Sequence, residues 1–234
     1  MHPLVQQYLD VKSGRSTEPE LVAIEGRWAL DHARRHGVPV EAVLTTADVG
    51  AKAMARMTER DGPDGVVALV RVARRTLDDV QPRRRLLVVD AIERPGNLGT
   101  LIRAADGAGA DAVLVVDRRV RATHPLVVKA SMATSLSMPI VDVGRDEAVA
   151  WLVDNGVDTV AADPAATSSY RDVDYGPPAA VVVGNERRGL HPSWRTAPAT
   201  LAAIPMLGVA DSLNVTLAAA LLIYEAVHRQ RALP

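Results

Sequence analysis

Three polar clusters interrupt an otherwise apolar chain, and their residue types could bind a ligand and assist a reaction. They lie in PGNLGTLIRAAD, VVVGNERRGL and ADSLNV, and they contain Asn97, Arg103, Glu186, Ser212 and Asn214. A guanidinium can pair with a phosphate or stabilise a developing oxyanion. Glycines beside a carboxylate let a ligand approach the backbone closely. Together the clusters are candidates for one reaction site.

Each cluster also has a plain structural interpretation. Asn97 follows a Pro–Gly turn and could cap the next helix, and Asp211 or Ser212 could cap the last helix. Arg103 is expected on the apolar face of its helix, where it needs an ion-pair partner or a bound phosphate or ribose. The G-x-E-x-x-G frame around Glu186 suits either a loop or a site. All three clusters follow expected strand ends, where open α/β sheets bind ligands, and this combination favours a site.

Apolar runs of strand length alternate with segments of helical spacing, which predicts an α/β fold with a mostly parallel, doubly wound sheet. We expect a small N-terminal α/β domain at 1–76, a charged linker at 77–85 and a larger domain at 86–234. The expected strands are 21–25, 40–46, 66–72, 86–92, 111–117, 138–143, 157–162, 179–185 and 199–205. The expected helices are 26–37, 47–60, 97–109, 125–136, 145–155, 192–197 and 212–230, with a turn at 61–65.

Composition excludes several classes of protein. The chain has 27 Lys and Arg against 28 Asp and Glu, so a nucleic-acid contact must come from local basic groups. Without cysteine there are no disulfides or cysteine zinc sites, and the pair His32 and His36 lacks a third ligand, so we expect no metal. No apolar run has membrane length and no signal peptide is evident, which predicts a soluble cytoplasmic protein. The local basic groups are Arg71, Arg74, Arg75, Arg83–Arg85, Arg118, Arg119, Arg121, Arg187 and Arg188.

The order and spacing of PGNLGTLIRAAD, VVVGNERRGL and IPMLGVADSLNVTLAAALLIYEA resemble the three signature motifs of the SpoU (TrmH-like) ribose methyltransferases of the SPOUT superfamily. This resemblance covers about residues 86–230. The segment 124–141 resembles the family's intervening segment, with Lys129 where Arg is usual and Met132 where Gly is usual. More loosely, AIEGRWAL and the turn before GVVALV resemble the ribosomal-protein-like substrate-binding domain attached to many members.

The resemblance implies a deep trefoil knot in the C-terminal domain and a homodimer whose active site forms at the interface. It also implies S-adenosylmethionine (SAM) as methyl donor, bound against backbone groups of the knot loops. The family's backbone contacts correspond here to Gly184, Ile204 and Leu213, with Val183, Asn185, Met206 and Gly208 lining the same pocket.

The implied reaction transfers a methyl group to a ribose 2′-hydroxyl of RNA. Arg103 matches the family's catalytic arginine, and our hypothesis is that it holds a phosphate and stabilises the alkoxide, since a guanidinium is a poor base. Asn97 would position Arg103 or the RNA backbone, and Glu186 would orient Arg103 or Asn214. Ser212 and Asn214 would fix the reacting ribose and the knot loop.

The appended N-terminal domain favours ribosomal RNA as substrate, with transfer RNA as the alternative. A small molecule such as a nucleoside stays open as substrate because the net charge is only −1. A non-catalytic RNA-binding relative is a further alternative, and the intact Arg103, Glu186, Ser212 and Asn214 argue against it. Two departures from the family pattern are basic: Arg94 stands where an acidic residue is common, and Arg187 and Arg188 extend the second motif. Both could contact an RNA phosphate backbone.

Overall fold

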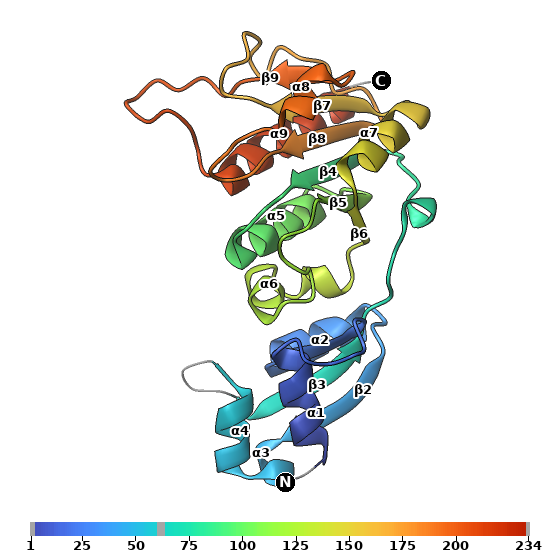
Figure 1. The fold of residues 1–234 in the computed structure, drawn as a ribbon, viewed down its shortest axis with the longest axis vertical. Helices are drawn as coiled ribbons and strands as arrows, with labels where there is room; N and C mark the ends of the chain where they lie inside the picture. The colour runs from blue at the N-terminus through green and yellow to red at the C-terminus, as the bar shows by residue number, and fades with distance from the viewer. Residues whose placement is uncertain (1–2, 60–63, 233–234) are drawn as a thin grey trace.

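The computed structural model describes residues 3–59 and 64–232, so the predicted turn at 61–65 lies partly outside the described residues. Figure 1 shows two parts stacked along the long axis of the molecule. We call them the N-terminal part (residues 3–71) and the C-terminal domain (residues 85–232), and a connecting segment (residues 72–84) joins them. None of the described helices is both long enough and apolar enough to cross a membrane.

The N-terminal part is a three-stranded antiparallel sheet in the order β1-β3-β2, with helices packed against it. Its predicted strands are confirmed, whereas the first helix was not predicted. The predicted helix at 47–60 is two short helices instead, because Gly50 has a φ of 78° and interrupts it. The elements are α1 Pro3–Lys12, β1 Leu21–Glu25, α2 Arg27–Arg35, β2 Val40–Thr45, α3 Thr46–Val49, α4 Ala51–Met57 and β3 Val66–Arg71.

The C-terminal domain has a six-stranded sheet in the order β6-β5-β4-β8-β7-β9, and all its strand pairs are parallel, which confirms the predicted α/β fold. A 3₁₀ turn, η1 Leu77–Asp79, precedes it. The elements are β4 Arg85–Asp90, α5 Pro95–Gly107, β5 Ala112–Val116, α6 Pro125–Ala130, η2 Thr134–Leu136, β6 Ile140–Val143, α7 Arg145–Asp154, β7 Asp158–Ala162, β8 Ala179–Val183, α8 Pro192–Thr196, β9 Thr200–Ala202 and α9 Val215–Ala232.

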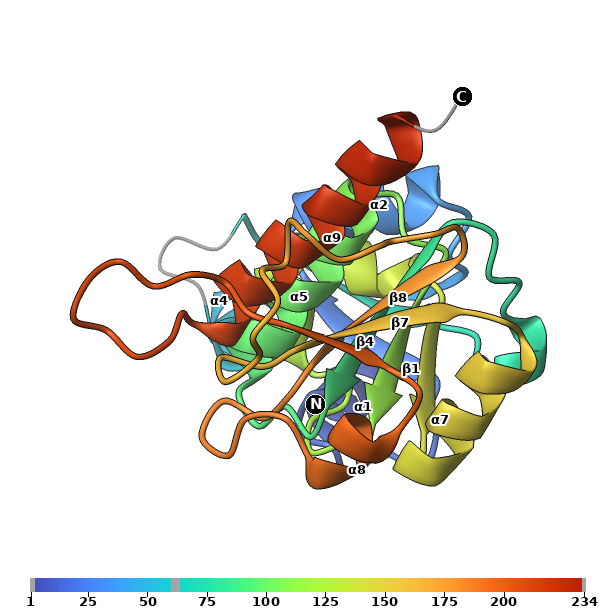
Figure 2. The same cartoon turned by 90° about the horizontal axis from the view of Figure 1, so that it is seen from above.

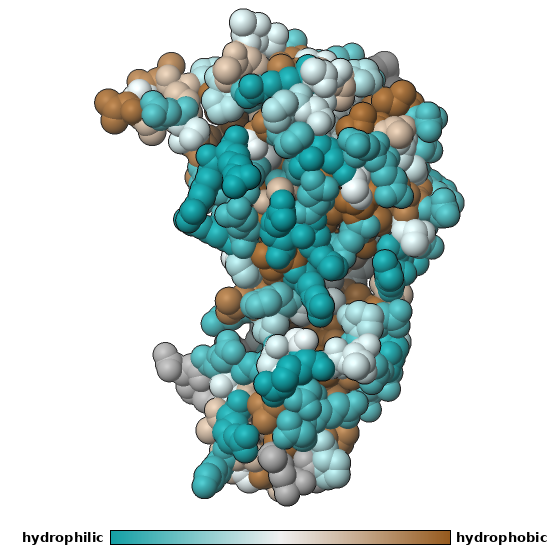
Figure 3. Space-filling model, in the orientation of Figure 1, coloured by the Kyte–Doolittle hydropathy of each residue, from teal (hydrophilic) through white to brown (hydrophobic). Residues whose placement is uncertain are grey.

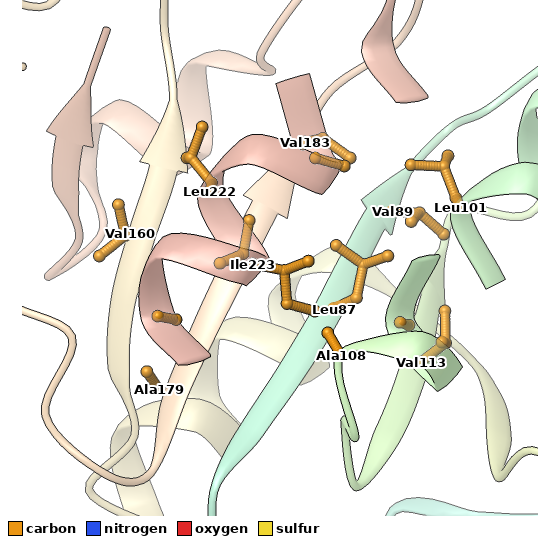
Figure 4. Close-up of a cluster of buried hydrophobic side chains, with 14 of the residues drawn as sticks. Leu87, Val89, Leu101, Ala108, Val113, Val160, Ala179, Val183, Leu222 and Ile223 are labelled. Carbon is orange, nitrogen blue, oxygen red and sulfur yellow. The ribbon is translucent and has the colours of Figure 1, made fainter. Parts of the chain in front are cut away.

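Helices cover both faces of this sheet, and the view from above shows α5 and α9 on one side with α7 and α8 on the other (Figure 2). Alternate residues of β4 explain this arrangement, because Leu87 and Val89 pack with α5 and α9, whereas Leu86 and Val88 pack with α7 and α8. Figure 4 shows the side chain of Leu87 on β4 beside that of Ile223 on α9. Strands buried on both faces need continuous apolar runs, which is the pattern of LLVV and AAVVV.

Three predicted helix boundaries are wrong. The helix expected at 125–136 is divided into α6 and η2, because Met132 and Ala133 have φ values of 53° and 66°. Asn97 does not cap α5, which begins two residues earlier with Pro95 at its first position. Neither Asp211 nor Ser212 caps α9, because the helix begins at Val215 and the Oδ1 atom of Asn214 accepts the hydrogen bond from Thr216 N at 2.9 Å.

Apolar packing also joins the two parts of the molecule. Val128, Ala133 and Leu136 of the C-terminal domain belong to the same buried cluster as α2 residues of the N-terminal part. His32 Nε2 on α2 lies 2.9 Å from the Ser137 hydroxyl. The predicted boundaries at 76 and 86 remain predictions, but each sheet lies wholly on one side of them.

Replacing Gly99 by alanine should destabilise the fold by about 1–3 kcal/mol, because α5 and α6 are in close contact there. A Cβ atom at Gly99 would lie 2.6 Å from both Ala130 Cβ and Val127 O. Gly96→Ala on the same helix is the matched control, since nothing lies within 4 Å of a Cβ there. Urea unfolding measures both free energies. Equal stability of the two variants would contradict the packing argument.

Candidate active site

A cavity of about 440 Å³ lies at the carboxyl ends of β7, β8 and β9. This is the edge at which parallel α/β sheets place ligands. Ten of the twelve residues predicted from sequence line the cavity, and they come from α5, the loop after β8 and the loop after β9. The ten are Asn97, Val183, Gly184, Asn185, Glu186, Ile204, Met206, Ser212, Leu213 and Asn214.

The loop after β8 is held in shape by its own hydrogen bonds. Asn185 and Gly189 exchange backbone hydrogen bonds of 3.0 and 2.9 Å, which close the loop. The side chain of Asn185 accepts from Arg187 N and Arg188 N and donates to Ala91 O at 2.8 Å. A Cβ atom at position 184 would lie 2.3 Å from the carbonyl oxygen of Gly189, so glycine is required. The loop therefore presents a preorganised backbone to the cavity.

Glu186 ties this loop to the start of α5. Its carboxylate accepts hydrogen bonds of 3.1 Å from Glu93 N and Arg94 N, and one of 3.0 Å from Asn97 Nδ2. Partial burial opposes its ionisation, but the backbone and side-chain hydrogen bonds outweigh that effect and lower the pKa of Glu186. The contacts differ from those expected, since Glu186 bonds neither Arg103 nor Asn214 in the described residues. A negative charge is favourable at this helix N-terminus.

The loop after β9 contributes apolar walls and an exposed polar turn. Ile204 and Leu213 are partly buried beside the cavity, whereas Ser212 and Asn214 are exposed. Asn214 Oδ1 accepts from both the backbone N and the hydroxyl of Thr216, each at 2.9 Å. These two bonds cap the opening turn of α9, and the exposed Ser212 side chain forms no hydrogen bond to the other described residues.

Two predicted site residues lie outside this cavity. Gly208 lies in the loop that projects from the domain in Figure 1, between the exposed residues Leu207 and Val209. Arg103 is exposed, and the prediction that it lies on the inner face of its helix is wrong. The inward positions of α5 are taken by Leu98, Leu101, Ile102 and Ala105, and the 3.6-residue period turns Arg103 away from them.

Sequence reasoning missed the contribution of β7. Ala162, Asp163 and Pro164 line the cavity, and Asp163 is buried. Its carboxylate accepts from Ala165 N at 3.0 Å and pairs with Arg195 of α8 at 2.8 Å, which anchors the end of β7. An acidic residue directly after an apolar strand was the available signal, as it was for Glu186.

The cavity combines apolar walls with backbone groups and a basic rim. Val183, Ile204 and Leu213 form the walls, and Arg94, Arg187 and Arg188 also border the cavity. Its volume falls in the range of small-molecule sites, about 300–1,000 Å³. Such a lining suits a flat heterocycle with an anionic second ligand at the rim. Among the described residues, no group of three His, Asp or Glu side chains could hold a metal ion.

Comparison with known proteins places these features in one family. The model of the SpoU rRNA Methylase family matches residues 84–224. A 23S rRNA (uridine(2479)-2'-O)-methyltransferase of Streptomyces viridochromogenes is 34% identical over 181 residues, which are 74% of this chain and 63% of that protein. The 23S rRNA (guanosine(2553)-2'-O)-methyltransferase RlmP of Bacillus subtilis is 30% identical over 172 residues, 74% of this chain and 68% of that protein.

A solved structure agrees over the whole chain. The AdoMet-bound rRNA methyltransferase from Sinorhizobium meliloti superposes with a TM-score of 0.88 at 28% identity, covering 100% of this chain and 96% of that one. The chain spans about three fifths to two thirds of the length of the curated relatives it matches. With the family model covering more than half of its residues, this chain belongs to the SpoU rRNA methylase family of RNA methyltransferases.

Proposed function

We propose that this protein transfers a methyl group from SAM to a ribose 2′-hydroxyl of RNA, with ribosomal RNA as the favoured substrate. The observation that carries the proposal is the convergence of all three motifs on one cavity at the carboxyl edge of the sheet. Relatives that methylate 23S rRNA support the choice of RNA. Mapping 2′-O-methyl groups in total RNA from cells with and without the protein tests the proposal and distinguishes ribosomal from transfer RNA.

The cavity suits SAM, which supplies an electrophilic sulfonium methyl group when bound. Val183, Ile204 and Leu213 offer apolar surface to the adenine, and the rigid loop after Gly184 offers backbone groups to its polar edge. Met206 and Asn185 complete this wall in the proposal. An AdoMet-bound relative with the same fold supports this placement.

The ribose hydroxyl is a weak acid, so the site must stabilise the charge that develops on its oxygen. We assign that role to Arg103, whose side chain has no ion pair or hydrogen bond within residues 3–59 and 64–232. Asn97 and Glu186 hold the start of α5 against the loop after β8 and so position this helix. Ser212 and Asn214 lie where the reacting ribose would sit.

Arg103 lies outside the cavity of its own chain, and we propose that a second copy of the chain completes the site. Leu217, Leu221 and Tyr224 form an exposed apolar stripe on α9, at the spacing of one helix face. This stripe adjoins the exposed face of α5, because a Cβ at Gly107 would lie 2.9 Å from the Tyr224 hydroxyl. A symmetric dimer through this face would bury the stripe and bring Arg103 to the interface.

The loop between β9 and α9, with Gly208 near its tip, projects beyond the domain at the upper left of Figure 3, where brown hydrophobic atoms lie among beige and teal ones. Leu207 and Val209 at its tip are both almost fully exposed, and neighbouring exposed apolar side chains can mark an interaction surface. The proposal places this loop against the second copy. The proposal also includes the deep trefoil knot in the C-terminal domain that the family resemblance implies.

Arg103→Ala should abolish methyl transfer, a loss of about 10²-fold or more, while SAM affinity changes by less than about two-fold. Arg103→Lys keeps the charge but loses the planar fork and should restore only part of the rate. Transfer of a radiolabelled methyl group measures the rate, and calorimetry measures SAM affinity. Full activity of Arg103→Ala would remove this residue from the mechanism.

Leu217→Glu should weaken the dimer by about ten-fold or more, because it places a charge in the proposed apolar interface. Val153→Glu is the matched control: Val153 is 51% exposed on α7, away from the stripe, and Leu217 is 56% exposed. Sedimentation velocity at micromolar concentration measures the fraction of dimer in both variants. A wild-type protein that sediments as a monomer would contradict the proposed interface.

Glu186→Gln should cost about 1 kcal/mol of unfolding free energy at pH 7, because the charged form accepts three hydrogen bonds. The pKa of Glu186 is lowered from 4.5, so its stabilisation is present above that value and declines as the pH falls through the lowered pKa. The wild type and the variant should therefore converge in acid. Urea unfolding from pH 7 downward measures the difference, with exposed Glu147→Gln on α7 as control. A constant gap at every pH would show that the carboxylate charge contributes nothing.

A further inference from the structure

A second group of cavities lies where the N-terminal part, the connecting segment and the C-terminal domain meet. One of them has a volume of about 240 Å³, and we call it the basic pocket. Four arginines line it: Arg74 and Arg75 from the connecting segment, and Arg118 and Arg121 from the turn after β5. The pocket thus brings together basic residues from distant parts of the chain.

The basic pocket carries excess positive charge. Of its four arginines, only Arg118 forms an ion pair within the described residues, with Asp142. The other carboxylate of the wall, Glu20, lies 4.0 Å from Arg71. Three guanidinium groups, those of Arg74, Arg75 and Arg121, therefore border the pocket without an ion pair to any residue within 3–59 and 64–232. Guanidinium groups are the side chains best shaped to bind a phosphate with paired hydrogen bonds.

The connecting segment is held in place beside the pocket. Arg75 forms a backbone bridge with Val141 on β6, the edge strand of the large sheet, and the segment runs past this edge in Figure 1. Arg75 also lies near Asp79, but the Asp79 carboxylate already accepts hydrogen bonds from the backbone and hydroxyl of Thr76. The backbone of Arg75 is anchored while its side chain stays exposed.

A buried hydroxyl on the pocket wall lacks a partner. Ser135 of η2 lines the basic pocket and is 2% exposed, and its Oγ atom has no hydrogen-bond partner within the described residues. Buried polar atoms without a partner are rare in folded proteins and usually mark a bound water, ion or ligand. The atom is shielded from solvent in this structure, so a phosphate oxygen would accept the hydrogen bond that this hydroxyl can donate once the side chain turns toward the pocket.

A neighbouring cavity extends from the basic pocket toward the start of α5. A cavity of about 500 Å³ shares Pro19, Arg121 and Thr123 with the basic pocket and extends to Pro95 at the start of α5. The next residue back, Arg94, lines the candidate active-site cavity. An extended strand could follow this path with its backbone against basic residues.

We propose that the basic pocket binds a backbone phosphate of the RNA strand whose target ribose occupies the candidate active site. This inference rests on the proposed function for its choice of RNA. Because Arg74 and Arg75 belong to the connecting segment, bound RNA would also hold the N-terminal part against the C-terminal domain. The pocket would therefore position the strand at a distance from the reacting ribose.

The double variant Arg74→Ala/Arg75→Ala tests this assignment in the full-length protein. Fluorescence anisotropy with a labelled single-stranded RNA of mixed sequence, without SAM, should show an affinity about five- to ten-fold lower. The slope of log affinity against log salt should fall by about 0.7–1.4. In methyl-transfer assays the KM for RNA should rise while kcat at saturating RNA stays unchanged.

Arg34→Ala/Arg35→Ala is the matched control, since it also removes two adjacent, exposed arginines from the N-terminal half, on α2 and outside the basic pocket. Its RNA affinity and salt slope should stay close to those of the wild type. Circular dichroism and SAM calorimetry confirm that both double variants are folded. An unchanged salt slope in Arg74→Ala/Arg75→Ala, or an equal loss in the control, would overturn the proposal.

Two further measurements test the pocket, and the second separates the possible sources of phosphate. Ser135→Ala should weaken RNA binding several-fold without changing the salt slope, because the hydroxyl is neutral. Inorganic phosphate at millimolar concentration should displace RNA only weakly. If the protein bound phosphate tightly and the arginine variants left RNA affinity unchanged, the pocket would be a site for a free anion, and the proposal would be overturned. A chain that binds RNA through this pocket yet transfers no methyl group would overturn the proposed function alone.

Discussion

The parallel pairing of β4 with β8 is the constraint on which the rest of this structure depends. The two strands lie more than 80 residues apart in the chain, yet Leu86 pairs with Ala180 and Val89 with Val183 at the centre of the sheet. Their carboxyl ends therefore meet, and the loop after β8 comes to lie beside the start of α5. Without this register, Asn97 and Glu186 could not form their 3.0 Å hydrogen bond.

On that frame, a few polar contacts give the site its shape. Glu186 holds the helix N-terminus, Asn185 holds its own loop and the carbonyl of Ala91, and Asp163 anchors the end of β7. Each carboxylate or amide satisfies backbone donors or acceptors that would otherwise be left over at the strand ends. The cavity is consequently preorganised on one side. Its other side is the exposed loop between β9 and α9, which has few contacts of its own.

In our proposal, a single copy of the chain presents only part of what the methyl transfer needs. The cavity has apolar walls that would suit the methyl donor, but Arg103 does not line it and the apolar stripe of α9 is exposed. The proposed second copy would cover the exposed apolar stripe of α9. The RNA strand would neutralise the arginines of the basic pocket. The substrate would thus be read by shape and charge spread over the two parts of the molecule.

The sequence by itself determined the parallel α/β fold and most of the candidate site. Continuous apolar runs such as LLVV and AAVVV require a sheet buried on both faces, and polar residues just after such runs identify its ligand-binding edge. That rule identified Glu186 and Asn97, and the recognisable motifs indicated the cofactor and reaction that we propose.

Only the tertiary structure decided contacts that depend on exact angles and distant partners. The helical period turned Arg103 outward, a two-residue shift in helix start moved Asn97 from a cap to a partner of Glu186, and Asn214 rather than Asp211 or Ser212 capped α9. The basic pocket likewise could not be predicted from the sequence. Its arginines come from segments more than 40 residues apart, and local patterns carry no information about which exposed side chains folding brings together.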